Sequence, residues 1–148
     1  MTEPNFMELA LAEAEAAAKR GEVPVGCVIV QGGAVIARAG NRTLVDHDPT
    51  AHAELLAVRE AARVLGSERL TDCDLYVTLE PCTMCAAAIS FARFRRIYYG
   101  APDPKGGAID SGVRFFGQPT CHHRPEVYGG IGEARAAALL RDFFAARR

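Results

Sequence analysis

The order of apolar and polar positions predicts helices alternating with strands along the 148-residue chain. An Ala- and Glu-rich segment from Asn5 to Arg20 is typical of a helix, with Asn5 as its N-cap and Gly21 as its stop. The other segments show β-branched runs or helical periodicity. Strands are predicted at 23–30, 34–39, 75–79, 96–99 and 126–128, and further helices at 50–65, 81–93 and 131–146. This alternation predicts an α/β fold.

Turn-forming residues sharpen several of these boundaries. Gln31-Gly32-Gly33 predicts a hairpin turn that makes the first two strands antiparallel. Thr50 is the expected N-cap of the second helix, and Pro81 stands at the first turn of the third, a position that proline tolerates. Residues 100–125 are rich in Gly and Pro and show no element of their own. Connections of that length in compact domains are usually functional or disordered.

The length and composition are those of an ordinary globular domain. Apolar residues make up 49% and charged residues 24%, and we expect residues 1–148 to form a single domain. The N-terminus lacks the basic and apolar regions of a signal peptide, and no apolar run is long enough to span a membrane. Five cysteines with one CxxC pair argue for a reducing compartment, so we expect a cytoplasmic protein.

Charge is unevenly distributed although the net charge is only −1. Residues 1–90 contain 7 Lys or Arg and 13 Asp or Glu, whereas residues 91–148 contain 10 and 5. Such a charge asymmetry is a hint of nucleic-acid contact, but it is equally compatible with helix and loop surfaces that differ in charge for no functional reason. The basic side chains that carry the hint are Arg93, Arg95, Arg96, Lys105, Arg114 and Arg124.

One imidazole and two thiols form the candidate metal site. His52, Cys82 and Cys85 are a three-ligand zinc set, which leaves the fourth tetrahedral position for water. All three fall at predicted helix starts, where the positive end of the helix dipole lowers thiol pKa values and favours metal binding. We therefore expect one Zn²⁺ per chain.

Glu54 lies two residues after His52, where it can handle the protons of that water without binding the metal. Zinc lowers the pKa of its bound water to about 7. A carboxylate that acts first as base and then as acid suits hydrolytic deamination at an sp² carbon. The metal set alone indicates hydrolysis and does not select the substrate.

A structural zinc knuckle is the main alternative, and it would need a fourth ligand. The candidates for that ligand are Cys73, Cys121, His47, His122 and His123, none closely spaced to the others. Cys27, Cys73 and Cys121 are otherwise expected to be small buried or surface thiols. The combination of H-x-E with P-C-x-x-C favours the open, catalytic site.

The chain resembles the zinc-dependent nucleoside and nucleotide deaminase superfamily, and within it the bacterial tRNA-specific adenosine deaminases. The resemblance covers nearly the whole length, through the zinc motif and several flanking segments. The segments are Glu22–Gly26, Asn41-Arg42, His47–Glu54, Leu75–Cys82, Gly100-Ala101, Asp103–Gly107, His123-Arg124 and Phe143-Phe144. It implies a three-layer α/β/α sandwich of the cytidine-deaminase-like type, with a central mixed five-stranded sheet flanked by helices. It also implies a homodimer that converts adenosine to inosine at the wobble position of a tRNA anticodon loop.

The resemblance assigns a role to each matching residue. His52, Cys82 and Cys85 would be zinc ligands and Glu54 the proton shuttle, while Asn41 would hydrogen-bond the flipped base. The expected pocket lining is Val25, Gly26 and Ala53, and the expected anticodon-loop contacts are Lys105, Asp103, Phe143 and Phe144. Two stretches, 111–116 and 119–123, depart from better-known members, which puts the loop contacts in doubt and leaves the zinc chemistry intact.

Two other functions remain open at this point. The same zinc site would serve a free-base or mononucleotide deaminase acting on guanine or cytosine. A non-catalytic RNA-binding module that keeps zinc for stability is a third possibility, and the intact Glu54 argues against it. Phe143 and Phe144 are equally compatible with plain core packing at a helix end.

Overall fold

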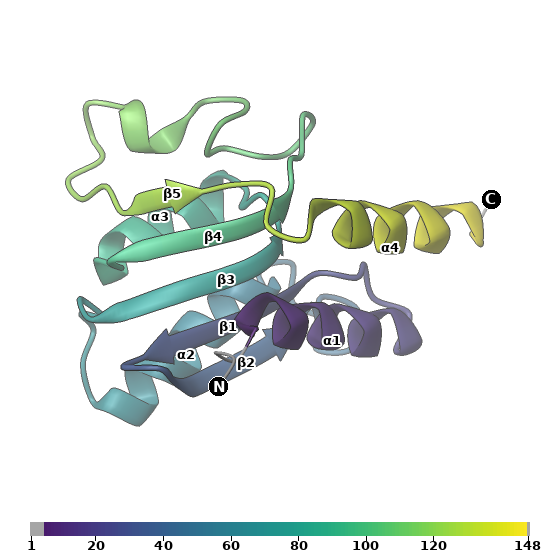
Figure 1. Cartoon of the computed structure of the whole chain (residues 1–148), viewed down its shortest axis with the longest axis horizontal. Helices are drawn as coiled ribbons and strands as arrows, with labels where there is room; N and C mark the ends of the chain where they lie inside the picture. The colour runs from purple at the N-terminus through teal and green to yellow at the C-terminus, as the bar shows by residue number, and fades with distance from the viewer. Residues whose placement is uncertain (1–4, 148) are drawn as a thin grey trace.

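A mixed five-stranded sheet forms the centre of the molecule in the computed structural model, which describes residues 5–147 (Figure 1). The strands are β1 (Gly26–Gln31), β2 (Ala34–Gly40), β3 (Cys73–Leu79), β4 (Arg96–Ala101) and β5 (Glu126–Tyr128). Their order in the sheet is β2-β1-β3-β4-β5. β1 pairs antiparallel with both β2 and β3, whereas β3–β4 and β4–β5 are parallel.

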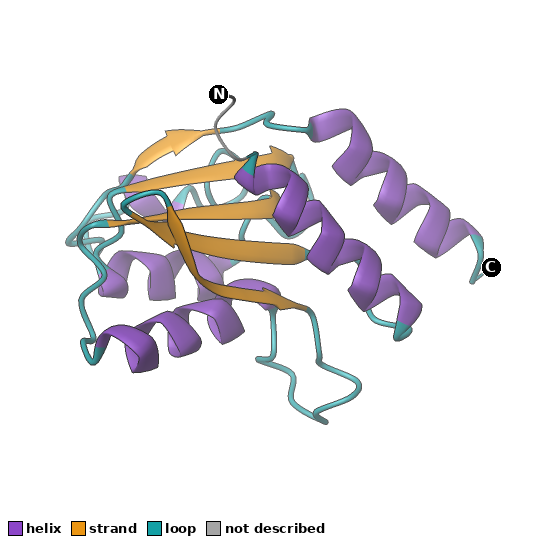
Figure 2. Ribbon diagram, turned by 60° about the horizontal axis from the view of Figure 1, so that its bottom comes forward, coloured by secondary structure: helices purple, strands orange, loops and turns teal. Residues whose placement is uncertain are grey.

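Helices cover both faces of this sheet. The helices are α1 (Phe6–Lys19), α2 (Ala53–Leu65), α3 (Thr83–Ala92) and α4 (Glu133–Ala145), with a short 3₁₀ turn, η1, at Phe115–Gly117. Figure 2 shows α1 and α4 together on one face and α2 and α3 on the other. The three-layer α/β/α sandwich is therefore confirmed. Among the described residues, no helix has the length and apolar content needed to cross a membrane.

Several helix caps and turns form at the residues that the sequence indicated. The Asn5 side chain accepts a hydrogen bond from the Glu8 amide and caps α1. Gly32 and Gly33 have φ of 56° and 79°, the positive values that a tight β1–β2 hairpin turn requires. Gly66 ends α2 in the left-handed conformation with φ of 62°.

The core lies on both sides of the sheet. Between the sheet and the α2–α3 layer, residues such as Phe94, Leu75 and Ile97 are fully buried. On the opposite face, Met7 and Leu11 of α1 pack over the sheet. Figure 1 shows α1 lying across the strands, and Gly26 explains how closely it approaches: a Cβ there would lie 1.9 Å from the carbonyl oxygen of Ala10.

Several expected boundaries were wrong, and three of them matter for the site. β1 begins at Gly26 rather than at residue 23, because the chain turns sharply where the Val25 amide donates to the Val23 carbonyl. Helix α2 begins at Ala53 with His52 as N-cap, and the Thr50 hydroxyl instead donates to Asp48. Helix α3 begins at Thr83, so Pro81 precedes it.

Candidate active site and metal centre

The candidate ligands meet where two helices begin, beside the end of β3. His52 is the N-cap of α2, Cys82 is the N-cap of α3, and Cys85 lies in the first turn of α3. Neither N-cap side chain makes the capping hydrogen bond that such positions usually make. Both side chains are thus turned toward a shared centre.

Distances between the donor atoms fit a zinc ion. The His52 Nδ1 atom lies 3.6 Å from the Cys82 Sγ atom and 3.7 Å from the Cys85 Sγ atom. Tetrahedral zinc with Zn–S of about 2.3 Å and Zn–N of about 2.0 Å separates a nitrogen and a sulfur ligand by roughly 3.5 Å. The arrangement of these three residues therefore fits one Zn²⁺, bound through Nδ1 of the histidine.

Within residues 5–147, these three side chains are the only group of three or more His, Cys, Asp or Glu residues that converge closely enough to hold a metal ion. Their ligand atoms all lie within 4.8 Å of one another. Cys73, Cys121, His47, His122 and His123 do not join this group. In the described part of the chain no fourth protein ligand completes a closed knuckle, which favours a catalytic over a structural site.

The electrostatics of the cluster favour a bound cation. The hydrogen bond from Cys85, together with His52, lowers the pKa of the Cys82 thiol to about 4. That same contact with Cys82, with burial, raises the pKa of Cys85. Metal binding needs both thiols deprotonated, and a bound cation would stabilise both thiolates. Burial raises the pKa of the nearby Glu54 to about 7, close to the range in which a carboxyl group both accepts and returns a proton.

Asn41 follows β2 and faces the cluster. Its Oδ1 accepts a hydrogen bond of 2.8 Å from the Ala53 amide at the start of α2. Since that oxygen is used, the orientation of the carboxamide is fixed and the Nδ2 group provides the donors. The Arg20 guanidinium donates to the Asn41 carbonyl oxygen and holds its backbone. Asn41 is therefore a rigid donor beside the candidate metal ligands.

These groups surround a cavity of about 340 Å³. Its lining consists of Val23, Val25, Asn41, Thr43, His52, Glu54, Leu79, Glu80, Cys82, Asp103 and Gly106. Of the expected substrate contacts, Val25, Asn41 and Asp103 lie on this wall. Gly26 and Ala53 do not: Gly26 lies against α1, and Ala53 contributes its amide to Asn41.

An adjoining groove of about 840 Å³ extends from this cavity to α4. The groove and the cavity share Val23, Leu79, Asp103 and Gly106. Lys105, Leu140, Phe144 and Arg147 line its far part, and Phe144 is 48% exposed. Phe143 is buried instead, with the Arg147 guanidinium 3.4 Å above its ring centroid.

Sequence reasoning missed two buried carboxylates that shape the rim of the cavity. Glu80 accepts hydrogen bonds from residues 103–111, and Glu22 accepts them from residues 43–45. In each case burial alone would raise the pKa, but the amide and hydroxyl donors outweigh it and the pKa lies below the usual range. A glutamate between Leu79 and Pro81, directly after an apolar strand, was the available signal for Glu80.

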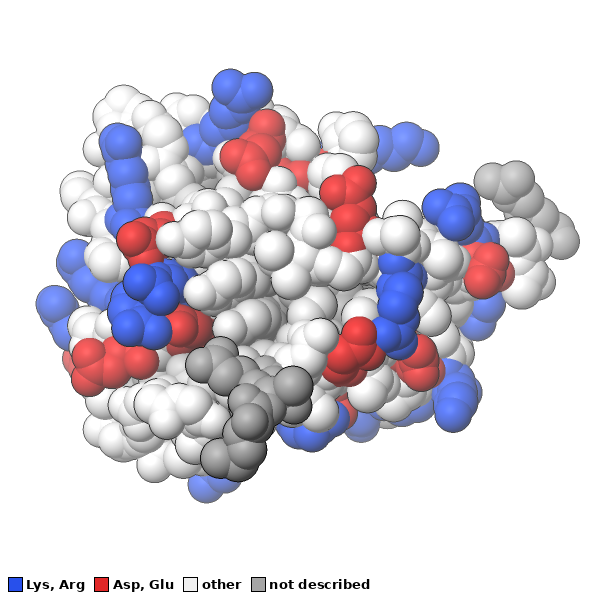
Figure 3. All heavy atoms as spheres, in the orientation of Figure 1, with Lys and Arg blue, Asp and Glu red and all other residues white. Residues whose placement is uncertain are grey.

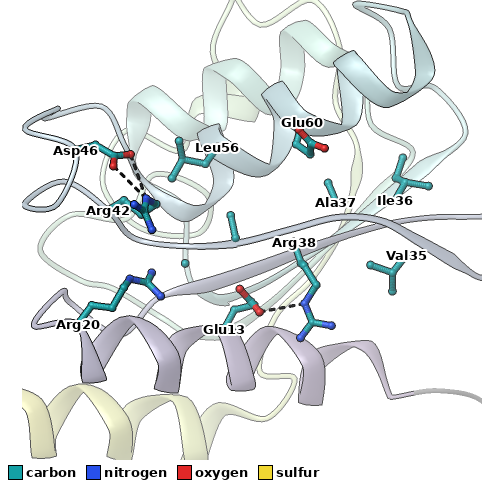
Figure 4. Close-up of a pocket in the computed structure, with 12 residues that line it drawn as sticks. Glu13, Arg20, Val35, Ile36, Ala37, Arg38, Arg42, Asp46, Leu56 and Glu60 are labelled. Atoms are coloured by element: carbon teal, nitrogen blue, oxygen red, sulfur yellow. Dashed lines mark hydrogen bonds and ion pairs between the residues drawn. The ribbon is translucent and has the colours of Figure 1, made fainter.

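A second depression, of about 680 Å³, lies along β2 between α1 and α2 (Figure 4). Four of its charged side chains form two ion pairs, Arg38 with Glu13 and Arg42 with Asp46. This depression contains none of the metal-binding residues. The chemistry of the molecule is therefore concentrated in the cavity at His52, Cys82 and Cys85.

Comparison with known proteins agrees with this geometry. Residues 1–101 match the family described as the cytidine and deoxycytidylate deaminase zinc-binding region. A tRNA-specific adenosine deaminase of Agrobacterium fabrum is 65% identical over 97% of this chain and 95% of its own length. A solved structure from studies of A-to-I editing by tRNA:A34 deaminases at the wobble position of transfer RNA superposes with a TM-score of 0.90 and 66% identity, covering 91% of this chain and 98% of that one.

A guanine deaminase of Bacillus subtilis is more distant, with 33% identity and a TM-score of 0.66 over 99% of this chain and 94% of its own. The likeness to it shows that this architecture also occurs in a deaminase named for another substrate. High identity over nearly the full length, in contrast, ties the chain to the first group. The chain belongs to the zinc-binding deaminase family and, within it, to the tRNA-specific adenosine deaminases.

Proposed function

We propose that this protein hydrolytically deaminates adenosine to inosine at the wobble position of a tRNA anticodon loop. The observation that carries the proposal is a cavity with metal-binding residues and Glu54 at one end and a groove leading away from it. Adenosine and water are consumed, and inosine and ammonia are released. The relatives named above support the tRNA substrate.

His52, Cys82 and Cys85 would hold the zinc ion, which when bound supplies a water polarised to a pKa of about 7. Glu54 takes a proton from the attacking water and passes it to a ring nitrogen of the base. The same carboxyl group then takes the remaining proton from the water oxygen, which is now bonded to the base carbon, and delivers it to the departing amine. As the C–N bond breaks, ammonia leaves and the carbonyl of inosine forms. Burial raises the pKa of Glu54 above its ordinary value, which favours exchange of protons in both directions near neutrality.

Asn41 orients the base in this scheme. The Nδ2 group donates to an acceptor on the purine, while Val25 and Leu79 supply apolar surface on the cavity wall. Gly26 and Ala53 contribute indirectly: Gly26 lets α1 approach the sheet, and Ala53 fixes the Asn41 side chain. Glu54 is 5% exposed, so bulk water has little access to its carboxylate.

The groove favours a polynucleotide over a free base. A single purine would need only the cavity beside Glu54, whereas the adjoining 840 Å³ groove has room for flanking nucleotides. Lys105 and Arg147 are placed to meet phosphates, and the exposed ring of Phe144 to stack on a base. Asp103 borders both compartments. Phe143 supports this end of α4 through packing.

Several basic side chains in the second half of the chain are neutralised by ion pairs. Arg95 pairs with Asp74, Arg96 with Glu126, and Arg135 with Glu8. On the face shown in Figure 3, basic and acidic side chains are interspersed. We therefore assign RNA contact to the groove. All five cysteines are free, which suits a reducing compartment, and we place the protein with its substrate in the cytoplasm.

A homodimer is supported by apolar side chains on the α2–α3 face. Phe91 of α3 is 73% exposed and Val64 of α2 is 48% exposed. A second copy covering this face would remove both from water. Light scattering of Phe91→Glu should give the mass of a monomer where the wild type gives that of a dimer, with Val35→Glu on β2 as a control that stays dimeric. Equal masses for Phe91→Glu and wild type would reject this interface.

The substrate is tested by incubating the protein with a tRNA that carries adenosine at the wobble position. Guanine, cytosine, adenine and free adenosine serve as parallel substrates. Inosine at the wobble position and no ammonia from the free compounds is the expected result. Efficient turnover of guanine or cytosine without editing of the tRNA would replace the proposal with the free-base alternative, and no turnover at all would favour the non-catalytic module.

A further inference from the structure

Glu80 is a buried charge for which the deamination chemistry has no use. Its side chain is only 2% exposed and lies between the end of β3 and the metal-binding residue Cys82. Ionised groups are rarely buried unless their hydrogen bonds are fully satisfied, because desolvation is costly. The partners of Glu80 therefore indicate what it does.

Those partners come from one loop, residues 102–111. The Glu80 Oε1 atom accepts from the Asp103 amide at 2.9 Å and from the Ser111 hydroxyl at 2.9 Å. The Oε2 atom accepts from the amides of Ile109, Asp110 and Ser111 at 3.0, 2.9 and 2.9 Å. A single carboxylate thus holds both the start and the end of the loop.

The middle of the loop passes directly beside the metal-binding residues. Gly107 forms a β-bridge with Cys82, and the Ala108 amide donates to the Pro81 carbonyl. A Cβ at Gly107 would lie 2.5 Å from the Glu80 carboxyl carbon, so the backbone passes too close for any side chain. The loop backbone is therefore packed closely around this carboxylate.

This loop forms one wall of the substrate cavity. Asp103 and Gly106 line both the cavity and the groove, and the Asp103 carboxylate is itself held by the amides of Lys105 and Gly106. We propose that Glu80 is a positioning residue, which sets the place of Asp103 and Gly106 and thereby the fit of the substrate nucleotide. This inference rests on the proposed function for its kinetic part and on the loop geometry alone for its structural part.

Glu80→Gln tests the inference. Glutamine has the same size, but its side-chain NH₂ group would face the amide and hydroxyl donors of the loop, with which it cannot form hydrogen bonds. Amide hydrogen exchange should accelerate at Asp103 and at 109–111, and trypsin should cut after Lys105 faster, while β1–β4 amides stay protected. Glu22→Gln is the matched control: it should release residues 43–45 and leave 103–111 protected.

In the tRNA assay, KM of Glu80→Gln should rise about 10- to 100-fold with kcat little changed and one zinc per chain retained. Ser111→Ala removes one of the five donors and should change amide exchange and KM in the same direction by a smaller factor. This milder variant keeps the inference testable if Glu80→Gln does not fold. Unchanged exchange at 103–111, or a released loop with unchanged KM, would overturn the inference. Loss of zinc from Glu80→Gln would overturn it as well, since Glu80 would then support the ligands rather than the loop. A wild type that edits no tRNA would instead refute the proposed function and leave the exchange result standing.

Discussion

Asn41 combines two roles that two substitutions can separate. Its Oδ1 accepts the Ala53 amide at the start of α2, and its Nδ2 faces the cavity. Asn41→Ala removes the acceptor, and loss of such a helix-terminal hydrogen bond costs about 1 kcal/mol of unfolding free energy. Asn41→Asp keeps an acceptor at the positive end of the helix dipole, where a carboxylate is favoured by up to about 1 kcal/mol.

Activity should respond differently from stability. Both variants lose the Nδ2 donors, so an acceptor on the bound base is left unpaired at a cost of about 1–3 kcal/mol. That energy corresponds to a fall of roughly 5- to 150-fold in kcat/KM. Asn41→Asp should therefore unfold in urea within about 1 kcal/mol of wild type and yet be as inactive as Asn41→Ala.

The assay is urea unfolding beside steady-state deamination of the tRNA substrate. Asn5→Ala is the matched control, because Asn5 caps α1 in the same way, at a distance from the cavity. It should lose about 1 kcal/mol of stability and keep wild-type kcat/KM. Wild-type activity in Asn41→Asp would refute the reasoning, since the donor group would then be dispensable.

Three further outcomes are expected. Metal analysis should find one zinc per chain in wild type and in Cys121→Ser but none in Cys82→Ser; full zinc in the latter would exclude Cys82 as a ligand. Gly26→Ala should cost about 3 kcal/mol or more, because its Cβ would lie 1.9 Å from the Ala10 carbonyl, and a thermal melt near wild type would show that α1 can move away. The folded-state pKa of Glu22 lies below its ordinary value of 4.5, so its carboxylate stabilises the fold above that value and loses this effect as pH falls through the folded pKa. The unfolding free energy of Glu22→Gln should therefore differ from wild type most at pH 7 and less near pH 3, and a constant difference would contradict the assignment.

The helices, the strands and the candidate zinc ligands could be identified from the sequence because their signals are local. The Gly32-Gly33 turn and the spacing of His52 and Glu54 act through neighbours in the sequence. Cys82 and Cys85 likewise fall within one helix start. The family resemblance then supplied the substrate, which no local pattern encodes.

The loops around the cavity could not be predicted, because distant partners order them. Glu80 binds amides 23 to 31 residues away, and Glu22 binds amides 22 and 23 residues away. Helix α2 shows the same effect: Thr50 was the expected cap, but the acceptor comes from Asn41, which lies 12 residues before Ala53. The sequence pattern of residues 100–125 shows no regular element because their order depends on such distant partners. In the structure they contain η1 and wrap around the buried carboxylate of Glu80.

The most direct test of the account compares wild type with Glu54→Gln on a tRNA bearing a wobble adenosine, with zinc measured in the same samples. Both proteins should contain one zinc per chain, since Glu54 lies outside the group of His52, Cys82 and Cys85. Wild type should produce inosine at the wobble position, and the variant should produce none above the uncatalysed background. Inosine formed at the wild-type rate by zinc-loaded Glu54→Gln would contradict the central claim that this carboxylate carries the protons of the deamination.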